Sequence, residues 1–194
     1  MVVLPLLLTA AWHSRKDLPV ALRGAVDARD GGLDVRYGAP LGPHPLLITA
    51  LERRLAEAGV PVGDPGVRAG TAVVLAAAGS GDPGAVAAIG RMAARWQAQR
   101  GWAAVVPSYA SAAAPDPATA VSRLTAVGAR RVVVASYLLA PGRFATQVRE
   151  STLAAGAAAV SEVLGAAPEL ADVVLARYQA ARARTATGGI ARIA

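Results

Sequence analysis

The sequence predicts a three-layer α/β/α fold built on doubly wound parallel sheets. Apolar runs of strand length alternate along the chain with segments of helical periodicity, as in repeated βαβ units. Several of these runs are continuously apolar, which is typical of strands buried on both faces of a parallel sheet. The pattern of residues 4–19 also returns, in a blunted form, at residues 132–148, so we expect an internal duplication.

The predicted strands are short apolar runs bounded by turn residues. In chain order they are residues 2–9, 33–37, 71–77, 103–109, 131–137 and 157–163. Charged Asp34 and Arg36 alternate with apolar residues in the second of these runs, so we expect that strand to lie nearer a sheet edge.

Helical faces are predicted between the strands from apolar residues spaced three and four apart. These faces are Leu47, Leu51 and Leu55; Val86, Ile89, Ala93 and Trp96; and Leu170, Val174 and Tyr178. Each face would pack on a sheet. Gly59 and Gly101 stand where helix C-caps would fall. Asp82 followed by Pro83 has the pattern of an N-cap and a first helical residue.

The repeat also predicts how the chain is divided. Residues 39–55 match residues 162–178, because a Leu-Gly pair, a proline three residues after the glycine and an arginine in the last helical turn recur in register. We therefore expect a partial N-terminal domain at 1–65, carrying only the second half of a full unit. A C-terminal domain would occupy 66–185, followed by a flexible tail at 186–194.

The composition, rich in arginine and free of cysteine, limits the possible functions. The net charge is +7, but the cations are scattered and form no block typical of a nucleic-acid-binding tail. The lack of cysteine excludes disulfides and thiolate metal sites. No apolar run reaches the ~18 residues of a membrane span, and the apolar start lacks the basic flank of a signal peptide. We expect a cytoplasmic protein with no nucleic-acid or membrane partner, suited to a small polyanionic ligand.

Several short motifs carry a resemblance to a known family. They are AAWHSRKDLP at 10–19, LGPHP at 41–45, AAAGSGDP at 76–83 and LLAPGRF at 138–144. Together they resemble the sirohydrochlorin chelatases, the class II cobalto- and ferrochelatases of cobalamin and sirohaem biosynthesis, over nearly the whole chain. The resemblance implies chelatase-like sheets in which the first half-domain is incomplete, because the family's N-terminal first-motif unit is missing.

The resemblance implies an ATP-independent lyase. Such an enzyme inserts a divalent metal ion, Co²⁺ or Fe²⁺ with Ni²⁺ as a further candidate, into sirohydrochlorin without an organic cofactor. His13 would be the catalytic residue and the metal ligand. The family uses two histidines, and Ala78 stands where a catalytic copy of the first would hold one. The alternative is a degenerate, non-catalytic protein that binds a tetrapyrrole or a metal ion on the same scaffold.

Chemistry supports His13 because neutral imidazole can bind a metal ion or accept a pyrrole proton. His13 also follows a predicted strand, at the sheet edge where α/β proteins bind ligands. Arg15, Lys16 and Arg143 are the cations expected to face the carboxylates of the substrate, with solvated loop charges as the alternative. Ser80 is expected to bind substrate from a loop that otherwise reads as a tight turn.

Two further polar residues have mainly structural interpretations. His44 stands between two prolines just before a helix, so we expect it to start that helix, with a metal role as the alternative. Asp17 would either cap the following helix or orient His13. The incomplete first half would also leave a bare sheet edge, for which a homodimer is the expected remedy.

Overall fold

The computed structural model describes residues 1–10, 17–27 and 35–183. The elements are β1 (Val2–Val3), α1 (Leu18–Asp27), β2 (Arg36–Tyr37), α2 (Pro45–Glu57), α3 (Pro65–Ala69), β3 (Thr71–Ala77), α4 (Pro83–Arg100), β4 (Ala104–Tyr109), α5 (Pro117–Ala126), β5 (Arg131–Tyr137), α6 (Arg143–Ala154), β6 (Ala159–Val160) and α7 (Pro168–Ala183).

The main sheet has four parallel strands in the order β4-β3-β5-β6, and β1 pairs with β2 in a separate parallel sheet. In the main sheet Val73 of β3 lies between Val105 of β4 and Val133 of β5. Every residue of β3 is buried, as the continuous apolar run predicts.

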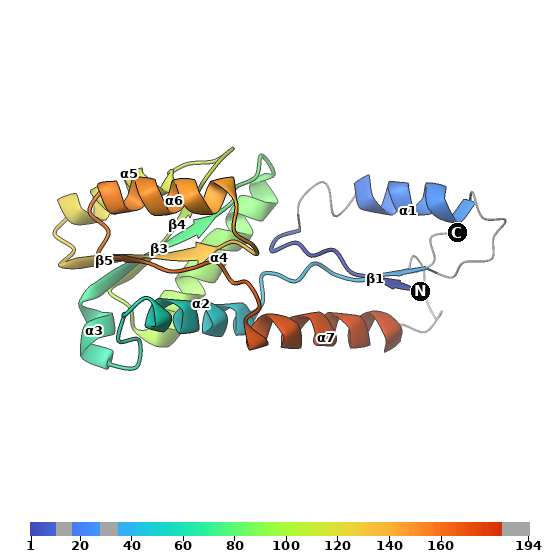
Figure 1. The fold of residues 1–194 in the computed structure, drawn as a ribbon, viewed down its shortest axis with the longest axis horizontal. Coiled ribbons are helices and arrows are strands. Elements are labelled where there is room, and N and C mark those ends of the chain that lie inside the picture. Colours follow the sequence, from blue (N-terminus) through green and yellow to red (C-terminus); the bar gives the residue numbers. More distant parts are fainter. Residues whose placement is uncertain (11–16, 28–34, 184–194) are drawn as a thin grey trace.

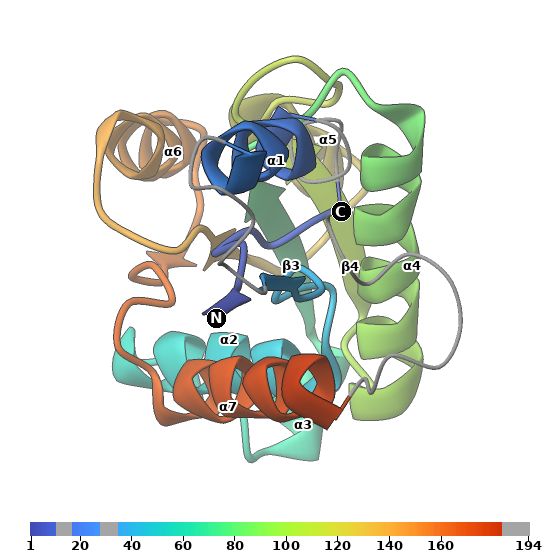
Figure 2. The same cartoon turned by 90° about the vertical axis from the view of Figure 1, so that its right-hand side faces the viewer.

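Two cores cover the two faces of the main sheet, which gives the predicted three layers (Figures 1 and 2). Successive strand residues point to opposite faces. Val73 and Leu75 therefore join a core with α2 and α4, whereas Val74 and Ala76 join a core with α5 and α6. The apolar stripe of α2, with Leu51 at its centre, is fully buried. Each such leucine contributes about 1.5–3 kcal/mol of burial free energy.

The duplication is visible in the order of elements. β1-α1-β2-α2 and β5-α6-β6-α7 have the same sequence of strands and helices, and each pairs its two strands in parallel. The last helix of each copy contacts the other copy: α2 packs on β5, whereas α7 contacts β1 and β2 and lies beside α2. Figure 1 shows α7 extending beneath β1.

Two matching arginines make this exchange reciprocal. Arg54 of α2 donates from Nε and Nη2 to the Leu164 carbonyl oxygen, at 3.2 and 2.8 Å. Arg177 of α7 donates from Nη2 to the Leu41 carbonyl oxygen at 3.3 Å. Arg54 and Arg177 are the arginines that recur in register in the sequence, and Leu41 and Leu164 are the leucines of the two recurring Leu-Gly pairs. Each repeat therefore donates a hydrogen bond to the other. The domain division near residue 65 stays a prediction.

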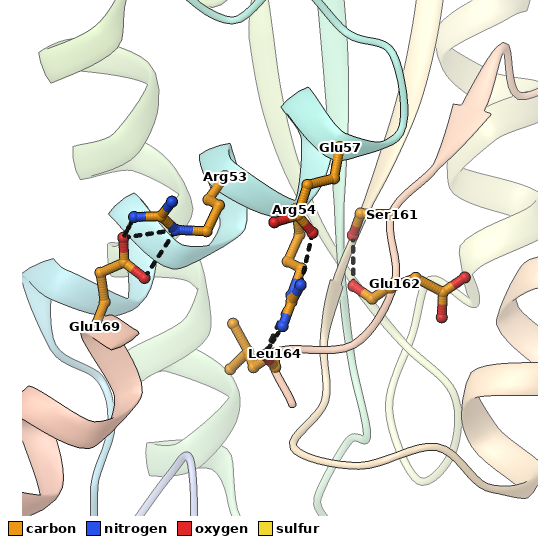
Figure 3. Close-up of polar contacts among 7 residues, drawn as sticks. All are labelled: Arg53, Arg54, Glu57, Ser161, Glu162, Leu164 and Glu169. Carbon is orange, nitrogen blue, oxygen red and sulfur yellow. Dashed lines mark hydrogen bonds and ion pairs between the residues drawn. The ribbon is translucent and has the colours of Figure 1, made fainter. Parts of the chain in front are cut away.

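Figure 3 shows the polar contacts around this junction. Arg53 pairs with Glu169 in the first turn of α7 at 2.6 Å. Arg54 also pairs with Glu57 at 2.6 Å, and the Ser161 hydroxyl donates to the Glu162 carbonyl oxygen at 2.9 Å. The Arg53–Glu169 pair and the Arg54–Leu164 contact join helix α2 to the C-terminal repeat, in addition to the apolar face of the helix.

The predicted helix ends are confirmed. Asp82 is the N-cap of α4, its side chain accepting from the Gly84 N–H, and Pro83 is the first helical residue. Gly101 is the left-handed C-cap of α4. Gly59 directly follows the C-cap of α2, with φ +82°.

Some predicted elements are wrong in extent. The strand expected at 2–9 ends at Val3, because Pro5 has no N–H for the ladder and the chain then turns, with Leu7 N–H donating to the Pro5 carbonyl. The strands expected at 33–37 and 157–163 are likewise two residues long in the part described.

The buried face predicted for the last helix is also wrong in part. Tyr178 of α7 is 40% exposed, whereas Val173, Ala181 and the polar Glu169 are buried. The C-terminal half of α7 lies beyond the main sheet (Figure 1), so it meets the short β1-β2 pair instead of a broad apolar face.

Candidate functional site

A cavity of about 420 Å³ lies at the carboxyl ends of β3 and β5. Its walls are residues 6–9, the loop 77–81, the start of α4, Tyr109 and residues 137–139. Parallel sheets of this type bind ligands at the same edge, because the loops that leave the strands converge there. The cavity is therefore the candidate site.

The loop after β3 is shaped by a glycine and capped by Ser80. Gly79 has φ +95°, and a Cβ atom there would collide with the Ser111 carbonyl oxygen. The Ser80 hydroxyl accepts from the Asp82 N–H at 3.1 Å. The expected tight turn is confirmed, and Ser80 also lines the cavity.

Two buried tyrosines, Tyr109 and Tyr137, line the cavity. The Tyr137 hydroxyl donates to the Leu8 carbonyl oxygen at 3.0 Å, and Tyr109 donates to the Val86 carbonyl oxygen at 3.1 Å. Burial raises the pKa of both phenols above the ordinary value, so both stay neutral donors. Tyr137 thus holds the N-terminal segment against the C-terminal repeat.

Gly42 allows this contact to form. A Cβ atom at Gly42 would collide with both the Tyr137 hydroxyl and the Leu8 carbonyl oxygen. The sequence interpretation missed the two tyrosines as site residues. Each tyrosine is the last residue of a predicted strand, and side chains at that position lie at the carboxyl edge of the sheet. This position in the sequence could have identified them.

The structure brings only part of the predicted site together. His13, Arg15 and Lys16 lie outside the described residues, as does the expected tail at 186–194. Ser80 lines the cavity, but Arg143 does not. Arg143 begins α6, and its guanidinium carbon lies 5.6 Å from the centre of the Phe144 ring.

The described lining of the cavity is mostly apolar and includes no charged side chain. Over the same described parts of the chain, no group of three or more His, Asp or Glu residues could hold a metal ion. Apolar walls with a few hydroxyl and backbone groups at one rim suit the flat face of an organic molecule rather than a bare ion.

His44 has the predicted structural role. It is the N-cap of α2, and its Nδ1 atom accepts from the Leu46 N–H at 3.2 Å. Burial, and then the charge of Arg177, holds the pKa of His44 below its ordinary value. Asp17 directly precedes α1, and its role as a cap stays a prediction. None of the helices in the described ranges is long and apolar enough to cross a membrane.

Comparisons with known proteins match most of the chain. The family model CbiX matches residues 1–58 and 72–181. The chain is 28% identical over 150 residues to a sirohydrochlorin cobaltochelatase of Priestia megaterium, covering 77% of this chain and 48% of that protein. It is 25% identical over 148 residues to a sirohydrochlorin ferrochelatase of the same species, covering 76% of this chain and 53% of that protein. The chain thus spans about half the length of the curated relatives that it matches.

Solved structures share the fold. SirB from Bacillus subtilis with Fe³⁺ superposes with a TM-score of 0.80 at 24% identity, covering 94% of this chain and 71% of that one. CbiX, described as the terminal enzyme for siroheme biosynthesis in denitrifying bacteria, superposes with a TM-score of 0.69 at 24% identity, covering 92% and 74%.

Proposed function

This chain belongs to the CbiX family, and we propose that it is an ATP-independent chelatase that inserts Co²⁺ or Fe²⁺ into sirohydrochlorin. The family match along nearly the whole chain is the observation that carries the proposal. The names of the two curated relatives supply the substrate and the two candidate metals.

The cavity supports binding of the macrocycle at the carboxyl ends of β3 and β5. Its apolar walls suit the face of a tetrapyrrole, and the Ser80 loop offers a hydroxyl and backbone groups at the rim. His13 follows the cavity-lining Thr9 by four residues in the sequence. In the proposal His13 binds the incoming metal ion or accepts a pyrrole proton, since neutral imidazole has one free ring nitrogen.

The remaining proposed roles are electrostatic. Arg15, Lys16 and Arg143 would attract the carboxylates of sirohydrochlorin, in keeping with a net charge of +7. We propose that the metal ion is a substrate, that no organic cofactor, nucleic acid or membrane takes part, and that the protein works in the cytoplasm as a homodimer.

The second candidate function is tetrapyrrole or metal binding without insertion. Ala78, which the family resemblance aligns with a catalytic histidine, lines the cavity. If turnover needs a second histidine, the chain would bind its ligand without inserting a metal ion.

The absorption spectrum of sirohydrochlorin distinguishes these functions. The parent chain should accelerate the spectral change that Co²⁺ or Fe²⁺ insertion causes under anaerobic conditions, and His13→Ala should abolish the acceleration. The rate should also fall as the pH drops through the imidazole range, because protonated imidazole can neither bind metal nor accept a proton.

Arg123→Ala, at an exposed position on α5, is the control and should keep the parent rate. If His13→Ala also keeps that rate, the assignment of His13 is wrong. If the parent chain binds sirohydrochlorin but never accelerates insertion, the binding function is correct.

A further inference from the structure

A second cavity lies between the start of α2 and the middle of α4. Its volume is about 220 Å³, and it shares no lining residue with the cavity described above. Ile48 and Met92 form apolar walls, and His44, Arg91 and Arg95 supply its polar groups. The proposed chelatase reaction gives none of these residues a role, although His44 lies in the LGPHP motif at 41–45.

Arg91 and Arg95 are spaced four residues apart on α4, so both side chains lie on the same side of the helix. Neither has a hydrogen bond or an ion pair in the parts of the chain that the structure describes. Nearby arginines differ: Arg53 pairs with Glu169, and Arg100 pairs with Glu52. The cavity therefore has two cations that no carboxylate of residues 1–10, 17–27 or 35–183 neutralises.

Glu52 is the acidic residue of α2 that follows the cavity-lining Ile48 in the sequence, and its carboxylate already has two partners. Trp96 Nε1 donates to Glu52 Oε1 at 3.0 Å, and Arg100 Nε lies 3.4 Å from Glu52 Oε2. Both carboxylate oxygens of Glu52 are thus held by residues further along α4 than Arg95. No acidic residue is among the described residues that line the cavity.

His44 adds a neutral donor to the same cavity. Its Nδ1 atom accepts from the Leu46 N–H, which assigns the ring proton to Nε2 in the neutral imidazole. The lowered pKa of His44 keeps the ring neutral near pH 7. A cation is a poor occupant, because the guanidinium groups of Arg91 and Arg95 repel it and no described lining side chain is anionic.

We propose that this cavity binds a small organic oxyanion, held by Arg91 and Arg95, with its apolar part on Ile48 and Met92. A guanidinium group presents paired N–H donors that match the oxygens of a carboxylate or a phosphate. The volume lies below the ~300–1,000 Å³ of typical drug-sized sites, so the occupant is smaller than a tetrapyrrole. The described lining has no aromatic side chain on which the bases of a single-stranded nucleic acid could stack.

Nuclear magnetic resonance of the histidine side chains can test this proposal, because the chain has 2 histidines. His44→Gln assigns the two imidazole signals. Benzoate and phenyl phosphate, added separately, should shift the His44 signal in a saturable way and leave that of His13 unchanged. Saturation by benzoate alone identifies a carboxylate ligand, and saturation by phenyl phosphate alone identifies a phosphate ligand.

Arginine variants show whether the charge pair holds the ligand. Arg91→Gln and Arg95→Gln should each raise the apparent Kd at least about tenfold, because each loses a charge-assisted hydrogen bond. Arg130→Gln removes the same charge from an exposed loop and should leave the Kd unchanged. Arg91→Lys keeps the charge but loses the paired N–H donors of the guanidinium group. We therefore expect it to raise the apparent Kd less than Arg91→Gln does.

Three results would overturn the proposal. One is the lack of a saturable shift of the His44 signal with either probe. Another is an increase of the apparent Kd by Arg130→Gln that equals the increase by Arg91→Gln or Arg95→Gln, which would indicate a general effect of net charge. The third is equally tight binding of benzyl alcohol, which would show that the cavity recognises only the apolar part.

Discussion

Arg54 and Arg177 occupy matching positions in the two repeats and make the same kind of contact across the molecule. Arg54 uses two nitrogen atoms on the Leu164 carbonyl, whereas Arg177 uses one on Leu41. The Nε atom of Arg177 is buried and has no partner among the described residues. The Arg54 contact is therefore the stronger of the two.

We expect Arg54→Met to lower the free energy of unfolding by about 1–3 kcal/mol, since a hydrogen bond from a charged group is lost while the aliphatic volume is kept. Arg177→Met should cost less. Arg123→Met, on the exposed side of α5, is the matched control and should change little. Urea unfolding measures all three, and equal effects would show that the reciprocal contacts contribute nothing.

The Glu169 carboxylate should make stability depend on pH. Its hydrogen bond with the Arg53 side chain holds the pKa of Glu169 below the ordinary value of 4.5. The stabilisation is then complete above that ordinary value and is lost as the pH falls through the lower folded-state pKa. Glu169→Gln should therefore make the urea midpoint less sensitive to acid.

Glu150→Gln, at an exposed position on α6, provides the comparison and should keep the parent pH dependence. The assignment fails if the Glu169 and Glu150 variants have the same midpoint at each pH.

At the scale of elements, the loop between β3 and α4 shapes the candidate site through Gly79. Gly79→Ala would place a side chain at φ +95° and against the Ser111 carbonyl. We expect it to lower the free energy of unfolding by about 1–3 kcal/mol and to weaken sirohydrochlorin binding. The free energy comes from urea unfolding and the binding from absorption titration.

Gly81 offers a matched control in the same loop. A Cβ atom at Gly81 would meet nothing within 4 Å, so Gly81→Ala should leave stability near that of the parent chain. Comparable losses in both variants would mean that the loop is not held in the conformation described.

At the scale of the whole molecule, α2 joins the two halves of the chain. Its Leu51 side chain is fully buried in the core beneath β3 and β5. Leu51→Ala should therefore cost about 2–5 kcal/mol, and the far-UV dichroism and tryptophan fluorescence transitions should move together. Leu153→Ala, at a position 45% exposed on α6, should change neither. Separate transitions for the two signals would show that the halves unfold independently.

Much of the central sheet could be predicted from local sequence. The strands expected at 71–77 and 131–137 coincide with β3 and β5, and the one expected at 103–109 differs from β4 by one residue. A strand buried on both faces is apolar throughout, so its signal is complete within the strand itself. The short edge strands could not be predicted in extent, because apolar residues there also serve loops and cavity walls.

The sequence by itself determined the duplication, the central strands, the helix caps and the family, since each depends on residues close together in the chain or on their recurrence. Only the tertiary structure decided that α2 lies on β5, that Arg54 and Arg177 exchange partners, and that Tyr137 holds the segment at Leu8. The physical reason is that periodicity identifies which side of an element is buried. The identity of the distant element that covers that side depends on the path of the whole chain.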